Sequence, residues 1–170
     1  HNNLVFINKI YTIDNSLILE VRKNGLPEIT IFNLITGSQS DISFEDHAYD
    51  VSLSSNNEKE NLKFNYSYSS LTCPESIYSY DLDKNKSNLL WQKNIVGFDK
   101  ADYEDKRLFV EVRDGTKVPV ILLSKVDIDI NNAPILFYGY GSYGINVDAT
   151  FRSSILPVSY THLRAHETQS

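Results

Sequence analysis

The sequence is poor in sulfur-containing residues. Cys73 is the only cysteine among 170 residues, so no disulfide can form within the chain, and such usage favours a reducing compartment. Methionine is absent altogether, and a translated chain begins with one. We therefore expect a cytoplasmic protein for which His1 is not the native start.

Long apolar runs and an excess of positive charge are missing as well. No run approaches the roughly 18 consecutive apolar residues of a membrane-spanning helix, so no membrane partner is expected. The formal net charge of −6 argues against a nucleic-acid partner. Hydrophobic residues make up 41% of the chain, which is enough for a packed core in one or two domains.

The last residues differ in character from the rest. Residues 158–168 read VSYTHLRAHET, which resembles one reading frame of a sequencing adapter. We expect residues 157–170 to be a non-native tail, and they are set aside in reasoning about the fold.

Short alternating or β-branched segments dominate the first part of the chain. They recur about every 8–12 residues between turn residues, which is typical of an all-β fold. The expected strands are Leu4–Asn8, Leu17–Arg22, Glu28–Asn33, Ser38–Ser43, Tyr49–Leu53, Leu62–Tyr68, Ile77–Leu82 and Leu89–Lys93. A propeller blade uses four strands in about 40–45 residues, so residues 1–95 would form about two blades. A β-sandwich fits this pattern equally well.

A hairpin is expected further along the chain. Arg107–Arg113 and Lys117–Ser124 are apolar runs on either side of Asp114-Gly115. An Asp-Gly pair in this setting predicts a type I′ turn, because glycine tolerates the positive φ that this turn needs. Pro119 has no N–H to donate, which places the second strand at a sheet edge.

Pro134–Tyr138 is a continuous apolar run that ends in a glycine-rich turn. A strand of this kind is typical of α/β sheets that are covered on both faces. Since no segment has a convincing helical pattern, the covering helices are expected outside this chain.

Three segments resemble the prolyl oligopeptidase family, and in particular its oligopeptidase B branch. Residues 110–125 (VEVRDGTKVPVILLSK) and 134–151 (PILFYGYGSYGINVDATF) are similar to the start of the peptidase domain. Residues 64–82 (FNYSYSSLTCPESIYSYDL) resemble the last propeller blade, and a looser likeness covers residues 4–156.

The resemblance implies a specific fold class. The family fold is a seven-bladed β-propeller that caps an α/β-hydrolase domain, which favours the propeller over the sandwich. We expect a mainly β chain: the last blades of the propeller in residues 1–95, and the opening strands of the hydrolase domain in residues 96–156.

The resemblance also implies a serine-type endopeptidase. Its substrates would be short peptides cleaved after Lys or Arg through a Ser-His-Asp triad and an acyl-enzyme. In this fold the nucleophile lies in a G-x-S-x-G elbow, whereas residues 141–144 read GSYG. The Ser, Asp and His of the triad are therefore expected beyond this chain, and the chain alone is predicted to be inactive.

Three residues match positions of the family site. Tyr140 matches the tyrosine that donates its hydroxyl to the oxyanion, and a phenol is a suitable donor at neutral pH. Tyr143 matches an aromatic that lines the substrate pocket. Asp148 matches a carboxylate that binds basic substrate side chains, since a carboxylate can accept two hydrogen bonds from a guanidinium. Thr150 stands where the family usually has a second Asp, which removes one charge.

Two other functions remain open from the residues alone. One is a prolyl-specific oligopeptidase of the same family, and the other is a β-rich binding module without catalysis. The resemblance implies neither a cofactor nor a metal. Residues 139–144 fit the spacing G-x-G-x-x-G, but a poor helix start follows them, so no dinucleotide site is expected.

Overall fold

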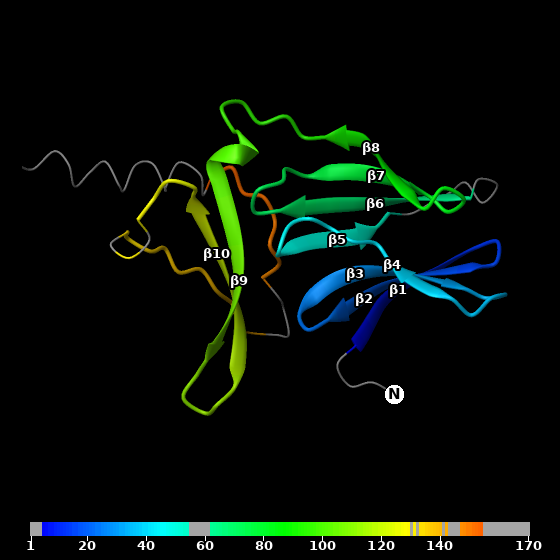
Figure 1. Ribbon diagram of the computed structural model, residues 1–170, viewed down its shortest axis with the longest axis horizontal. Helices are drawn as coiled ribbons and strands as arrows, with labels where there is room; N and C mark the ends of the chain where they lie inside the picture. The colour runs from blue at the N-terminus through cyan, green and yellow to red at the C-terminus, as the bar shows by residue number, and fades with distance from the viewer. Residues whose placement is uncertain are drawn as a thin grey trace, which may run out of the picture.

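The computed structural model describes residues 5–54, 62–129, 131, 133–140, 142 and 147–154. These residues form two four-stranded sheets and a two-stranded ribbon (Figure 1). The strands are β1 (Val5–Ile13), β2 (Ser16–Lys23), β3 (Leu26–Asn33), β4 (Gln39–Asp41), β5 (Tyr49–Leu53), β6 (Lys63–Ser70), β7 (Ser76–Asp81), β8 (Lys86–Gln92), β9 (Tyr103–Glu111) and β10 (Lys117–Lys125). A short 3-10 helix, η1 (Lys100–Asp102), precedes β9. The expectation of a mainly β chain is confirmed.

The first sheet is an antiparallel meander in the order β1-β2-β3-β4. Lys23 pairs with Leu26, so the turn between β2 and β3 has two residues. These are Asn24 and Gly25, with φ of 50° and 82°. Positive φ at both positions defines a type I′ turn, whose twist matches that of the flanking strands.

The second sheet repeats the meander in the order β5-β6-β7-β8. In β6 the side chains of Phe64, Tyr66 and Tyr68 are buried, while the residues between them are partly exposed. This period of two follows from the pleat of a strand and explains why the sequence pattern located the element. Each sheet is complete before the next begins, as in propeller blades and unlike the strand exchange of a Greek-key sandwich.

The two sheets share one hydrophobic core. Ile18 and Ile29 from the first sheet and Val51, Phe64 and Tyr66 from the second are at most 2% exposed. Burying a side chain of this size contributes about 1.5–3 kcal/mol, so the contact between the sheets is a main source of stability.

A buried carboxylate also joins the two sheets. Glu20 of β2 is 6% exposed, and its Oε2 accepts hydrogen bonds from the Leu53 amide at 2.8 Å and the Ser52 hydroxyl at 3.0 Å. Lys9 Nζ lies 3.3 Å from the same oxygen. The charge is therefore partnered, as buried charges must be.

The hairpin expected around Asp114 and Gly115 is present as β9 and β10, but its turn is of another type. Val112 N donates to Thr116 O at 2.9 Å, and Gly115 N donates to Val112 O at 2.9 Å. Gly115 has a φ of 82°, whereas Asp114 is not among the residues with positive φ. The connection is thus a three-residue loop with glycine in the left-handed region, and the type I′ prediction was wrong. Pro119 lies on β10, which pairs only with β9 among the described strands.

The buried strand expected at Pro134–Tyr138 is not observed. Residues 134–140 have no regular secondary structure, and Leu136 and Phe137 are 65% and 85% exposed. A central strand needs neighbouring strands and cover on both faces, and the described part of the chain offers this segment neither.

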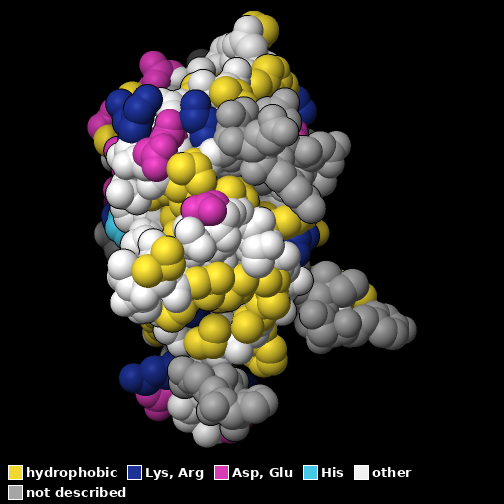
Figure 2. All heavy atoms as spheres, turned by 90° about the vertical axis from the view of Figure 1, so that its right-hand side faces the viewer, with side chains coloured by type: hydrophobic (Ala, Val, Ile, Leu, Met, Phe, Trp, Pro, Cys, Tyr) yellow, Lys and Arg dark blue, Asp and Glu magenta, His cyan; other side chains and the backbone are white. Residues whose placement is uncertain are grey.

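Apolar side chains are also exposed on the outer strands of the two sheets. They are Phe6, Ile7 and Ile10 on β1 and Leu89, Leu90 and Trp91 on β8. The space-filling view shows apolar side chains gathered over the middle of one face (Figure 2). Among the described residues, no helix is long and apolar enough to cross a membrane.

Candidate functional site

The structure places two of the three residues expected at the site, and the third lies outside the described residues. Tyr140 lies on the irregular segment 134–140 and is half-exposed. Asp148 lies on segment 147–154, which is drawn in orange and runs beside the ends of the second sheet (Figure 1). Tyr143 lies outside the described residues, and so do residues 155–170 with the expected tail.

Asp148 forms a two-pronged ion pair with Arg22. Arg22 Nη1 donates to Asp148 Oδ1 at 2.7 Å, and Nη2 donates to Oδ2 at 3.0 Å. The two side chains are 17% and 27% exposed. The carboxylate therefore holds a guanidinium in the manner expected for a basic substrate side chain, but the guanidinium belongs to the chain itself.

The β2–β3 turn also contacts the Arg22 side chain of this ion pair. Arg22 Nη1 also donates to Gly25 O at 2.7 Å, which fixes the guanidinium against the turn. Arg107 Nη2 of β9 donates to Asn24 O. A Cβ on Gly25 would lie 4.0 Å from a ring carbon of Pro119. The first sheet thus contacts segment 147–154 through Arg22 of β2 and the ribbon through Asn24 of the adjoining turn.

Segment 147–154 is also attached to the second sheet. Phe151 N donates to Ser69 Oγ at 3.0 Å. The Phe151 ring packs edge-on against Phe98 with centroids 4.8 Å apart. Arg152 covers the ring of Tyr138, with its Cζ 4.6 Å from the centroid. These contacts position Asp148 between the two sheets and the irregular segment that carries Tyr140.

A small pocket of about 240 Å³ lies between the second sheet and segment 147–154. It is lined by Asp50, Ser67, Tyr68, Ser69, Glu75, Thr150 and Phe151. Burial raises the pKa of Asp50 above its ordinary value, the charge of Asp148 adds to this rise, and Arg22 opposes it. Asp50, Asp148 and Arg22 therefore form one electrostatic group.

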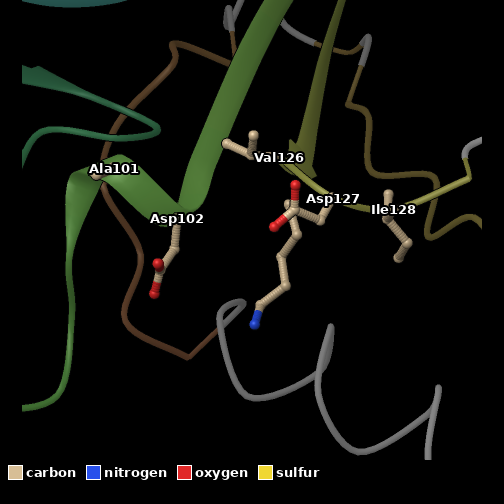
Figure 3. Close-up of a pocket in the computed structure, with 6 residues that line it drawn as sticks. Ala101, Asp102, Val126, Asp127 and Ile128 are labelled. Atoms are coloured by element: carbon tan, nitrogen blue, oxygen red, sulfur yellow. The ribbon is translucent and has the colours of Figure 1, made fainter.

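A second pocket, of about 280 Å³, lies at the start of the ribbon. It is lined by Ala101, Asp102, Lys125, Val126, Asp127 and Ile128 (Figure 3). Asp102 comes from η1, and Asp127 follows β10. None of the residues expected at the site lines this pocket, and we assign it no chemistry.

The link between the second sheet and the ribbon depends on Asp46. This carboxylate accepts hydrogen bonds from the Tyr68 hydroxyl at 2.6 Å, the Thr72 hydroxyl at 3.2 Å and Lys100 Nζ at 2.8 Å. Burial disfavours its ionisation, but the hydrogen bonds from Lys100, Tyr68 and Ser70 and the charge of Lys100 outweigh burial and hold the pKa of Asp46 below its ordinary value.

Neither Arg22 nor Asp46 was identified from the sequence. The spacing of Glu20 and Arg22 was the usable signal for Arg22, because two charged residues at positions i and i+2 of an expected strand lie on the same face. Their partners lie 126 and 54 residues away, and no local pattern indicates such pairings. The described residues contain no group of three His, Cys, Asp or Glu side chains that could hold a metal ion.

Comparison with known proteins identifies the family. Residues 1–93 match the family model described as the N-terminal β-propeller domain of prolyl oligopeptidase. The chain belongs to the prolyl oligopeptidase family. The two meander sheets are accordingly blades of a β-propeller, and the expected family is confirmed.

Curated relatives of this family member are peptidases by name. Dipeptidyl aminopeptidase BI of Pseudoxanthomonas mexicana is 31% identical over 153 residues, which cover 89% of this chain and 21% of the relative. Protease 2 of Moraxella lacunata is 27% identical over 160 residues, which cover 93% and 23%. The chain thus spans about a fifth of the length of these relatives.

Solved structures of oligopeptidase B resemble the family member over most of its length. The enzyme of Trypanosoma brucei, in a closed form with covalently bound antipain, gives a TM-score of 0.82 at 25% identity and covers 94% of this chain and 24% of its own. The enzyme of Leishmania major gives 0.80 at 28% identity, with 92% and 23% covered. These matches extend beyond the region of the family model, so they include much of the ribbon and the segments after it.

Proposed function

We propose that this chain is part of a longer cytoplasmic serine oligopeptidase that cleaves short peptides after Lys or Arg. The observation that carries the proposal is the likeness to oligopeptidase B over 94% of the chain, together with the propeller match in residues 1–93. Residues 1–95 would be the last part of the propeller, residues 96–156 the start of the α/β-hydrolase domain, and residues 157–170 a non-native tail.

The proposed chemistry is acyl transfer by a Ser-His-Asp triad that lies outside these 170 residues. Attack on the scissile carbonyl places negative charge on its oxygen, which a fixed hydroxyl stabilises. Tyr140 is assigned this donor role because it matches the oxyanion tyrosine of the family, and its segment contacts segment 147–154 where Arg152 covers the Tyr138 ring. Tyr143 would line the pocket for the substrate side chain, and Asp148 would attract its positive charge.

The test of the donor role uses the full-length protein and two matched tyrosine variants. Tyr140→Phe removes only the hydroxyl and is expected to lower kcat by about 10²–10³-fold, as the loss of one oxyanion donor does. Tyr138→Phe removes a hydroxyl two residues earlier and keeps the ring that Arg152 covers, so we expect activity within about twofold of wild type. Equal effects of the two substitutions would contradict the assignment.

The substrate class is tested with peptides that differ only before the scissile bond. We expect cleavage after Arg and Lys to exceed cleavage after Pro. The opposite order would favour a prolyl-specific enzyme, a function that several relatives named prolyl endopeptidase make the main alternative. The 170-residue chain alone is expected to cleave neither peptide, and a full-length protein without turnover would indicate a binding module.

A further inference from the structure

We propose that Arg22 is a specificity-determining residue: by pairing with Asp148, it weakens the attraction of that carboxylate for a basic substrate side chain. This inference rests on the proposed function, because it assumes that Asp148 faces the substrate. It assigns to the propeller a direct part in substrate choice, through one side chain of β2.

The geometry of the pair is the first argument. Both carboxylate oxygens of Asp148 accept from the Arg22 guanidinium, at 2.7 and 3.0 Å. A substrate guanidinium would bind Asp148 most strongly through the same two parallel hydrogen bonds. Arg22 therefore occupies the approach that a substrate arginine would use.

The position of the Arg22 side chain is the second argument. Its Nη1 is also bonded to Gly25 O, and the side chain is only 17% exposed. Arg22 itself is part of a regular strand pairing, between Phe6 and Pro27. Since the guanidinium is held by the fold, little conformational entropy is lost when it binds Asp148, and a substrate side chain competes at a disadvantage.

The surrounding charges give the third argument. Asp50 is close enough to respond to the charges of both Asp148 and Arg22. Arg22 therefore offsets two carboxylates, and Thr150 adds no charge at the edge of the same pocket. Replacing Arg22 by a neutral residue would leave Asp50 and Asp148 with a local excess of negative charge, which favours a cationic ligand.

The test compares Arg22→Gln with Lys23→Gln in the full-length protein. Lys23 is the next residue, and it pairs with Glu28 and Asp41 rather than with Asp148, so its substitution removes an equal charge elsewhere. The substrates are two peptides that differ only by Arg or norleucine before the scissile bond. We expect Arg22→Gln to raise the ratio of kcat/KM for Arg over norleucine about tenfold, which corresponds to the lower limit of the coupling energies of close charge pairs. Lys23→Gln should leave the ratio unchanged.

Two more variants separate specificity from a purely structural role. Arg22→Lys keeps the positive charge but loses the planar guanidinium that bonds both oxygens of Asp148. It should therefore raise the ratio of kcat/KM for Arg over norleucine less than Arg22→Gln does. The double variant Arg22→Gln/Asp148→Asn should not show the increased ratio of kcat/KM for Arg over norleucine. If Arg22→Gln instead changes kcat/KM for both substrates by the same factor, Arg22 only attaches the propeller to segment 147–154, and the proposal is overturned. Should Arg22→Gln fail to fold, Arg22→Lys decides.

A binding measurement keeps this inference apart from the proposed function. Titration calorimetry with a short arginine amide peptide and its norleucine counterpart needs no turnover. We expect Arg22→Gln to bind the arginine peptide about tenfold more tightly than wild type. A protein that hydrolyses neither substrate but shows this gain would refute the proposed reaction alone, and unchanged binding would refute the role of Arg22.

Discussion

The inner strands of the two propeller blades bury their apolar side chains, whereas the segments after the blades leave theirs exposed, as the outer strands β1 and β8 do. In the blades, Ile18, Ile29 and Phe64 are at most 1% exposed. In the ribbon, Leu108 and Phe109 are 45% and 56% exposed, and the values rise further in residues 135–138. Both regions have apolar sequences, so composition does not cause the difference.

The difference lies in where the packing partners come from. A blade obtains its cover from the next blade along the chain, and two consecutive blades already enclose a core. The ribbon and residues 134–140 find no such cover among the described residues. We propose that the helices and strands of the hydrolase domain supply it in the full-length protein, as an α/β sheet requires.

The largest predicted effect is the loss of a core phenylalanine in the second blade. Phe64→Ala should lower the free energy of unfolding by about 3–5 kcal/mol, because the buried ring leaves a cavity between the sheets. The matched substitution Phe109→Ala should cost about 1 kcal/mol or less, since this ring is mostly exposed and contacts Arg107. Urea unfolding of the 170-residue chain, followed by the fluorescence of its single tryptophan, Trp91, measures both.

Phe64→Ala and Phe109→Ala can also be compared in the full-length protein, where the ribbon has its proposed cover. If the hydrolase domain covers the ribbon there, Phe109→Ala becomes a core substitution and its cost should approach that of Phe64→Ala. A small cost in both settings would contradict the proposed cover.

An intermediate effect is expected at Asp46, which joins the second blade to η1. Asp46→Asn should cost about 1–3 kcal/mol at neutral pH, because the buried Tyr68 hydroxyl and the Lys100 ammonium group lose a charged acceptor. Since folding lowers the pKa of Asp46, its stabilisation is present above the ordinary pKa of 3.8 and is lost as the pH falls through this value to the folded pKa.

The pH dependence supplies the check on Asp46. Wild type and Asp46→Asn should converge in stability as the pH falls below 3.8. Asp83→Asn, in an exposed turn of the same sheet, serves as a control for the removal of one surface carboxylate. A constant gap between wild type and Asp46→Asn at all pH values would show that shape rather than charge matters at this position.

The sequence predicted the features that depend on neighbouring residues, such as the strands. It missed the contacts between residues that are far apart along the chain. All eight strands of the blades were located, because alternation such as that of Phe64, Tyr66 and Tyr68 is a local consequence of the pleat. The end of β1 was missed, since the strand continues to Ile13 beyond the expected end at Asn8. The turn around Gly115 was misjudged, since an Asp-Gly pair fits both a two-residue and a three-residue loop.

The site shows the same limit more strongly. Asp148 and Tyr140 were found only through resemblance, and their roles stay predictions. Arg22 could not be paired with Asp148 from the sequence, because 126 residues separate them and the contact exists only once the first blade meets segment 147–154. Long-range ion pairs of this kind leave no periodic signal.

The smallest predicted effect is a gain in stability at Asp50, between the blades and segment 147–154. Burial and the nearby Asp148 raise the pKa of Asp50, so its ionisation opposes folding and stability falls as the pH rises through the interval between the unfolded and folded pKa values. Asp50→Asn should therefore stabilise the chain at neutral pH, by about 1 kcal/mol or less, and have no such effect in acid. Urea unfolding at both pH values measures this. The gain should be larger in an Arg22→Gln background, because Arg22 is the charge that lowers the pKa of Asp50. An equal gain in both backgrounds would show that Arg22 and Asp50 are not coupled.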